Sequence, residues 1–77
     1  MKSVYSVQIG TNEEGLPEIT GLLNGSIVIK VGQSQRTDGI VWRVDTSQAL
    51  PVYPDIAKQI LKVQALVFQE MEEFNRG

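Results

Sequence analysis

The last third of the chain carries one uninterrupted helical pattern, and the rest of the fold has to cover it. From Pro54 to about Phe74 there is no Gly or Pro, and strong helix formers are frequent. Pro54 suits the first helical position, and Asp55 lies where the helix dipole favours an anion. We therefore predict a single helix at about residues 54–74, roughly 32 Å long.

Apolar residues wrap unusually far around this helix. At about 100° per residue they form a narrow stripe with further apolar residues on both sides of it. The whole arc spans about 220°, whereas a helix packed on one core needs only roughly 100°. The stripe contains Ile56, Ile60, Val63, Val67, Met71 and Phe74, and the flanking residues are Ala57, Leu61, Phe68 and Leu66. We expect a single copy of so small a chain to leave part of this arc exposed.

The length of 77 residues allows one small domain, residues 1–77. The chain has no Cys and no His, which removes disulfides, thiolate chemistry, the commonest general base and the commonest metal ligand. The formal charge of −2 is too small to indicate a polyionic partner. No apolar run is long enough for a secretion signal or a membrane span, so we expect a cytoplasmic protein without a membrane partner.

The first half of the chain alternates apolar and polar residues, as strands do. Asn24-Gly25 is a strong signal for a two-residue hairpin turn, and Asp38-Gly39 is a second candidate. Strands are expected at about residues 3–9, 18–23, 26–31 and 39–45, with residues 46–53 as a connector. The predicted fold class is α+β: a three- or four-stranded antiparallel meander with one long C-terminal helix packed on one face.

An uninterrupted register assigns each strand residue to a face of the sheet. A turn at Asn24-Gly25 would pair Leu22 with Ile27 and Thr20 with Ile29. The face toward the helix would then carry Leu22, Ile27, Ile29, Val31, Ile40, Trp42 and Val44, and the outer face Ile19, Leu23, Val28 and Val41. The same parity places Gln33 and Gln35 on the core side. Alternatively, residues 32–38 leave the sheet as a loop, which we favour because the segment is polar throughout.

Candidate chemistry is sparse. The chain has no phosphate-binding glycine motif, and its paired carboxylates, such as Glu13-Glu14, are typical of solvated charge. We predict no catalytic residue, no cofactor and no metal site. Lys2, Lys30 and Arg43 fall on the outer sheet face by strand parity, together with Arg36 if the second hairpin is long. Trp42 alternates with apolar residues and is interpreted as a core anchor.

The leading functional hypothesis is a non-enzymatic, oligomeric binding module that acts by protein–protein association. By analogy alone, it would be one of the small accessory or inhibitory proteins of the phage-type regulatory kind. We expect a homodimer or higher oligomer. Self-association is assigned to Leu61, Leu66, Phe68, Met71 and Phe74, supported by Ile19, Leu23, Val28 and Val41 of the outer sheet face. Contact with a ligand or partner is assigned to Gln33, Gln35, Arg36 and Arg43.

Two other classes of function remain open. In one, an anionic small molecule such as a nucleotide binds in a pocket between subunits, held by Arg36, Arg43 and the segment at residues 32–39. In the other, the basic outer face of the sheet binds nucleic acid. The sequence pI of about 4.9 argues against the latter. A different protein is also a possible partner for the exposed apolar arc.

Overall fold

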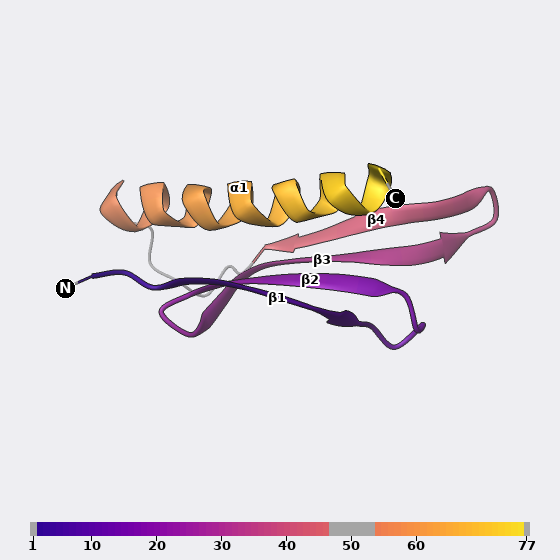
Figure 1. Cartoon of the computed structure of the whole chain (residues 1–77), viewed down its shortest axis with the longest axis horizontal. Helices are drawn as coiled ribbons and strands as arrows, with labels where there is room; N and C mark the ends of the chain where they lie inside the picture. The colour runs from indigo at the N-terminus through magenta and orange to yellow at the C-terminus, as the bar shows by residue number, and fades with distance from the viewer. Residues whose placement is uncertain (1, 47–53, 77) are drawn as a thin grey trace.

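The computed structural model of the chain describes residues 2–46 and 54–76. Its elements are β1 (Tyr5–Thr11), β2 (Pro17–Leu23), β3 (Ser26–Arg36), β4 (Gly39–Thr46) and α1 (Pro54–Arg76). The strands form one antiparallel sheet in the order β1-β2-β3-β4, and α1 packs on one face of it (Figure 1). The predicted α+β fold is confirmed, with four strands rather than three. The expected connector, apart from Thr46 at its start, lies outside the described residues.

The turn between β2 and β3 forms at Asn24 and Gly25, as the sequence predicts. Both residues have positive φ, 52° and 83°, which a type I′ turn requires. Leu23 pairs with Ser26 across this turn. The Asn24 side-chain oxygen also accepts a hydrogen bond from the Val4 N–H at 2.8 Å, so the turn holds the segment that leads into β1.

A register shift in this hairpin overturns part of the predicted face assignment. Leu22 pairs with Ile27 as expected, but the ladder shifts between Gly21 and Leu22, and Gly21 then pairs with Ile29. Val28 is the extra residue, without a partner in β2, so β2, including Leu22, and Ile27 have the opposite facing to the predicted one, whereas Ile29 and Val31 keep the predicted core face. Ile19, Leu23 and Val28, predicted on the outer face, are therefore buried in the core. Conversely, Ile27 was predicted inside and is 47% exposed.

Gly21 lies at the centre of this irregularity, directly beneath the helix. A Cβ atom at this position would come within 2.6 Å of Val63 Cγ1 and 2.8 Å of Val67 Cγ2, and within 2.7 Å of Ile29 Cγ2. No ordinary side chain fits in that space. The absence of a side chain thus lets α1 approach the backbone of β2 closely.

The β3–β4 hairpin is longer than predicted, and the expectation of a polar loop at residues 32–38 is wrong. β3 continues to Arg36, which pairs with Gly39 across a two-residue turn at Thr37-Asp38, so the turn predicted at Asp38-Gly39 lies one residue earlier. Gln33 faces Trp42 and Gln35 faces Ile40, so both glutamines keep the parity that the strand alternative gave them. Backbone pairing over the whole ladder outweighs the polar character of the segment. The tip of this hairpin extends past the C-terminal end of α1 (Figure 1).

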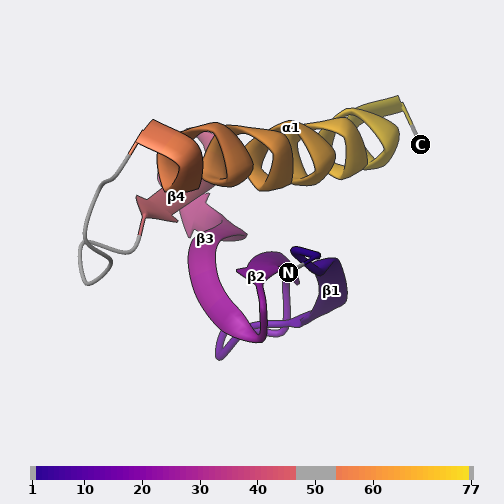
Figure 2. The ribbon, with the colours of Figure 1, turned by 90° about the vertical axis from the view of Figure 1, so that its left-hand side faces the viewer.

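The core lies between α1 and the middle of the sheet. It consists of Ile19, Leu23, Val28, Ile29, Val31, Val63 and Val67, with Val7, Trp42, Ile60 and Met71 packed against it. The predicted helical stripe therefore supplies the helix side of the core. Seen from one end, the sheet curls from β4 and β3 beside α1 round to β2 and β1 (Figure 2). Within the described residues, no helix is long and apolar enough to cross a membrane.

Candidate functional site

One side of the core is left open between α1 and β4. We use the term open flank for four exposed apolar side chains there, Ile40 and Val44 of β4 and Leu61 and Phe68 of α1. Their exposed fractions are 53% and 50% on the strand and 64% and 43% on the helix. By strand parity, Ile40 and Val44 lie on the face of the sheet that carries the core. The apolar arc that the sequence predicts is thus only partly covered by the chain's own sheet.

The open flank exists because the helix packs over the other three strands. In the described residues, α1 has Cα atoms within 8 Å of β1, β2 and β3 but not of β4. Trp42 spans the gap: its ring meets Phe74 edge-on at 6.1 Å between centroids, and its Nε1–H donates to Asn75 Oδ1 at 3.0 Å. Trp42 is therefore a partly buried anchor on the core side, as the sequence suggests.

The helical spacing shows which flank of α1 faces β4. Leu61, Phe68 and Asn75 are seven residues apart and so share one side of the helix. Asn75 contacts Trp42, which places this side toward β4. Leu66 lies seven residues after Gln59, and Gln59 accepts a hydrogen bond from Ser3 Oγ at 2.6 Å on the β1 side. The two exposed flanks of the helix therefore face opposite edges of the sheet.

Val44 and Phe68 are the members of the open flank that lie nearest each other along the molecule. β4 and α1 run in opposite directions (Figure 1). Two strand residues span about as much length as four helical residues, roughly 6 Å. Trp42 contacts Phe74 and Asn75 near the C-terminal end of α1. From there, Val44 lies farther along β4, toward the helical turn that contains Phe68. Ile40 lies in the other direction, toward the tip of the β3–β4 hairpin.

The residues predicted for self-association are divided by the fold. Leu61 and Phe68 lie on the open flank, and Leu66, 40% exposed, lies on the opposite flank. Met71 packs against the core, while Phe74 is 37% exposed beside Trp42. Among the outer-face residues given a supporting role, only Val41 is exposed, at 39%. The register shift removes Ile19, Leu23 and Val28 from any association surface, because they fill the chain's own core.

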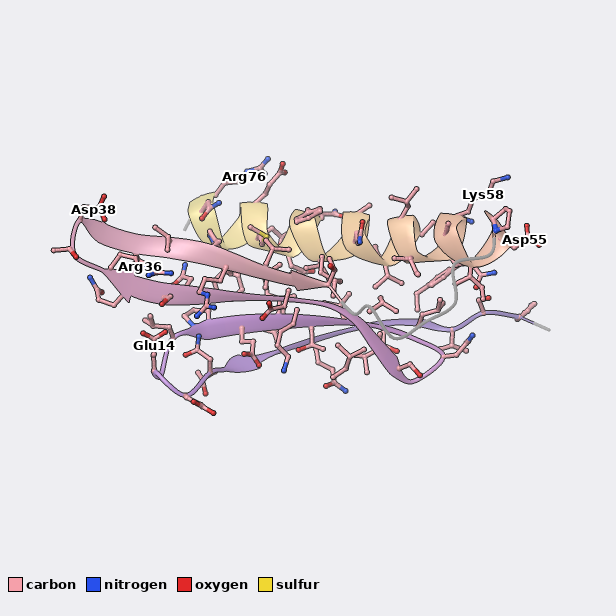
Figure 3. The ribbon with its side chains drawn as sticks, turned by 180° about the vertical axis from the view of Figure 1, so that it is seen from behind. Glu14, Arg36, Asp38, Asp55, Lys58 and Arg76 are labelled. Atoms are coloured by element: carbon pink, nitrogen blue, oxygen red, sulfur yellow. The ribbon has the colours of Figure 1, made fainter. Side chains whose placement is uncertain are left out.

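The outer face of the sheet contains a polar hollow of about 410 Å³. It is lined by Asn12, Glu13, Glu14, Glu18, Lys30, Gly32, Gln33, Ser34, Arg43 and Asp45. The lining includes two of the predicted contact residues, Arg43 and Gln33, although by strand parity the Gln33 side chain lies on the core face and the Asn12 side chain contacts the Gln33 backbone carbonyl. Gln35 instead donates its side-chain amide to the Arg36 carbonyl at 3.1 Å. Arg36 lies toward the tip of the β3–β4 hairpin, near Asp38 and at the same end of the molecule as Glu14 (Figure 3).

The charges around the hollow are mixed rather than basic. Four carboxylates line it, from Glu13, Glu14, Glu18 and Asp45, against two cations, Lys30 and Arg43. Lys30 Nζ lies 3.9 Å from Glu18 Oε1, so part of its charge is already compensated. An excess of negative charge disfavours a phosphate group. Among residues 2–46 and 54–76, no three acidic side chains gather as they would to hold a metal ion.

Asn12 organises the loop that forms one wall of the hollow, a role that the sequence reasoning missed. Its Oδ1 accepts hydrogen bonds from the N–H groups of Glu14 at 3.0 Å and Leu16 at 3.1 Å. Its Nδ2–H donates to the carbonyl of Gln33 in β3 at 2.7 Å. Asn frequently bonds to the backbone two residues later, so the position of Asn12 at the start of a polar turn was the available signal.

We expect Asn12→Ala to destabilise the protein by about 1–3 kcal/mol, because three hydrogen bonds are lost and the Gln33 carbonyl loses a partner. Chemical denaturation followed by circular dichroism would measure the loss. Thr11→Ala, at an exposed neighbouring position, is the control and should change stability by less than about 0.5 kcal/mol. Equal effects of the two substitutions would contradict the role assigned to Asn12.

Two surfaces are therefore available for function: an apolar flank beside an edge strand and a polar hollow on the opposite face of the sheet. Comparison with models of protein families, with curated proteins and with solved structures finds no match to this chain.

Proposed function

We propose that this protein is a small, non-enzymatic binding module that associates with a second copy of itself through the open flank. The observation that carries the proposal is the exposure of Val44, Leu61 and Phe68 at the edge of a small core. Apolar side chains gathered at one place on a soluble domain commonly mark an association surface. Covering them removes apolar area from water, which contributes roughly 25 cal/mol per Å².

The size of the domain strengthens this argument. A chain of 77 residues has a limited core, and residues 2–46 and 54–76 contain seven buried apolar side chains. Small domains commonly gain stability by recruiting further copies, and twofold dimers are the commonest closed arrangement. The open flank continues the existing core outward rather than forming a separate patch. A second copy would thus extend the core that the single chain leaves incomplete.

The alternative of a nucleotide or nucleic-acid partner has less support. Both would use the cations of the outer sheet face, and four carboxylates surround the hollow there. Association through apolar side chains needs no such charge. A regulatory role exerted through association, of the accessory or inhibitory kind, remains part of the proposal and rests on analogy with other small binding proteins.

Sedimentation velocity over a wide range of protein concentration tests the proposal. The wild-type protein should form dimers, whereas Val44→Glu and Phe68→Glu should shift the equilibrium to monomers by about tenfold or more, because each buries a charge in the interface. Leu66→Glu is the matched control, since Leu66 is similarly exposed on the flank that faces β1. Circular dichroism would verify that all variants are folded.

The experiment has clear contrary outcomes. A wild-type protein that stays monomeric at millimolar concentration would refute self-association. A loss of dimer in Leu66→Glu, without one in Phe68→Glu, would place the interface on the other side of the helix and contradict the assignment to the open flank.

A further inference from the structure

β4 is an edge strand that is well suited to pair with another strand. It lies at the end of the sheet order and pairs with β3 on one side. Hydrogen-bonded pairs alternate along an antiparallel ladder, so every second residue of β4 directs its N–H and C=O groups away from β3. The strand has no Pro, no Lys and no register shift against β3, features that commonly protect edges. Five of its eight residues are β-branched or aromatic.

The opposite edge, β1, is less suitable. Its sequence contains Gly10, which weakens a strand interior, and it has no charged side chain that could define a register. The hydrogen bonds that Val4 exchanges with Asn24 continue the β1–β2 ladder and do not involve the outer edge of β1. Ser3, just before the strand, donates to Gln59 of α1, which holds the start of this edge against the helix. β4 is therefore the edge at which a second copy would add.

The charges of β4 select one register for such pairing. Arg43 and Asp45 are two residues apart and lie on the outer face, on either side of Val44. We propose that two copies pair β4 with β4 in antiparallel orientation around Val44, with Arg43 of each copy opposite Asp45 of the other. Because the two copies are related by a twofold axis, the Arg43–Asp45 ion pair would occur twice in the dimer. This inference rests on the proposed self-association and specifies its geometry.

The same register also suits the other face of the strand. Val44, which is 50% exposed and belongs to the open flank, would face Val44 of the second copy. Trp42 would face Thr46 of the second copy, so its exposed edge gains a neighbour. Cross-strand pairs of this kind each stabilise a sheet by about 0.2–1 kcal/mol. Both faces of the strand are thereby used in one arrangement.

Neighbouring registers lack this complementarity. Pairing centred on Arg43 would put the two guanidinium groups opposite each other, and like charges in that position are destabilising. Pairing centred on Trp42 would put Asp45 opposite Gly39 and Arg43 opposite Val41, leaving all four charges without partners across the strands. A register centred on Val44 is therefore the one that the charge pattern of β4 favours.

Charge reversal tests this register directly. In a dimer of Arg43→Asp, both facing pairs would consist of two carboxylates, and in a dimer of Asp45→Arg both would consist of two guanidinium groups. Each single variant should therefore dimerise about tenfold or more weakly than the wild type. The double variant R43D/D45R should recover dimerisation. An equal mixture of the two single variants should form heterodimers, because every facing pair is then of opposite charge. Sedimentation velocity would give the dissociation constants, and native mass spectrometry would count the heterodimers.

Two controls separate specific pairing from an effect of net charge. Lys62→Glu changes the net charge as Arg43→Asp does, and Glu73→Lys changes it as Asp45→Arg does. Both positions are exposed and, by helical spacing, lie on a side of α1 away from Leu61 and Phe68 of the open flank. Neither control variant should change the dissociation constant by more than about twofold at physiological salt, because distant exposed charges are screened.

The outcomes distinguish this inference from the proposed function. If the wild type dimerises but Asp45→Arg has no effect, or the double variant does not recover, the register centred on Val44 is wrong while self-association stands. If the wild type is monomeric at all concentrations, both proposals fail. Preferential heterodimer formation between the two single variants, together with recovery in the double variant, would establish the Arg43–Asp45 pairs.

Discussion

Gly21→Val should unfold a large part of the protein population, making it the most disruptive single change expected in this chain. The added Cβ would lie within 3 Å of methyl groups from Val63, Val67 and Ile29, all of which are fully buried. Buried valine and isoleucine side chains have few alternative rotamers, so the helix itself would have to move away from β2. We expect a loss of about 3 kcal/mol or more for Val and about 1–3 kcal/mol for Ala. A domain of this size has only about 3–5 kcal/mol of stability from its core.

Gly10→Ala is the matched control for this prediction. Gly10 also lies in a strand, but no atom comes within 4 Å of a Cβ built there. The substitution should be neutral or slightly stabilising, since it reduces the freedom of the unfolded chain by about 0.4–1 kcal/mol. Urea denaturation followed by Trp42 fluorescence, at one fixed protein concentration, would measure both variants. Similar stabilities for Gly21→Ala and Gly10→Ala would contradict the close packing of α1 on β2.

Ile19→Ala should destabilise the protein by about 2–5 kcal/mol, whereas Ile27→Ala should cost less than about 1 kcal/mol. Both residues are isoleucines in the same hairpin, but Ile19 is 0% exposed and Ile27 is 47% exposed. The difference follows from the register shift between Gly21 and Leu22, which turns Ile19 into the core and leaves Ile27 on the outer face. Denaturation of the two variants under identical conditions would measure it.

This pair of substitutions also discriminates between two registers. An uninterrupted ladder from the Asn24-Gly25 turn would put Ile27 on the core face and Ile19 on the outer face. It therefore predicts the reverse order of stabilities. Equal losses at the two positions would be inconsistent with either arrangement and would mean that both side chains are half-buried.

The faces of the open-flank residues could be predicted from sequence, those of Ile40 and Val44 by strand alternation and those of Leu61 and Phe68 by helical spacing, but the facing of β2 could not. Helical spacing alone identifies Leu61 and Phe68 as lying outside the main stripe, because each residue advances by a constant angle. The faces of paired strands depend on one another: the extra residue in β3 reverses the facing of β2 relative to the rest of the sheet. Ile19, Leu23 and Val28 were therefore assigned to the wrong face, although Gly21 within a strand pattern was a signal for a bulge or a close approach.

The polar hollow illustrates the same limit for the surface. Arg43 and Gln33 were predicted as contact residues, but Asn12, Glu13 and Glu14 beside them come from the loop between β1 and β2. Their approach to β3 depends on the hydrogen bond from Asn12 to the Gln33 carbonyl, which connects residues 21 positions apart. The net balance of charge around the hollow is thus a property of the folded chain.

By itself, the sequence determined the features that depend on local geometry: the helix starting at Pro54, its apolar stripe, the type I′ turn at Asn24-Gly25 and the alternation of the strands. Each of these requires only neighbouring residues and a fixed backbone repeat. The tertiary structure decided where α1 rests on the sheet, and that choice set the rest. By settling over Gly21, the helix buries Ile19 and Ile29 and leaves β4 uncovered, because a single helix is too narrow to cover all four strands.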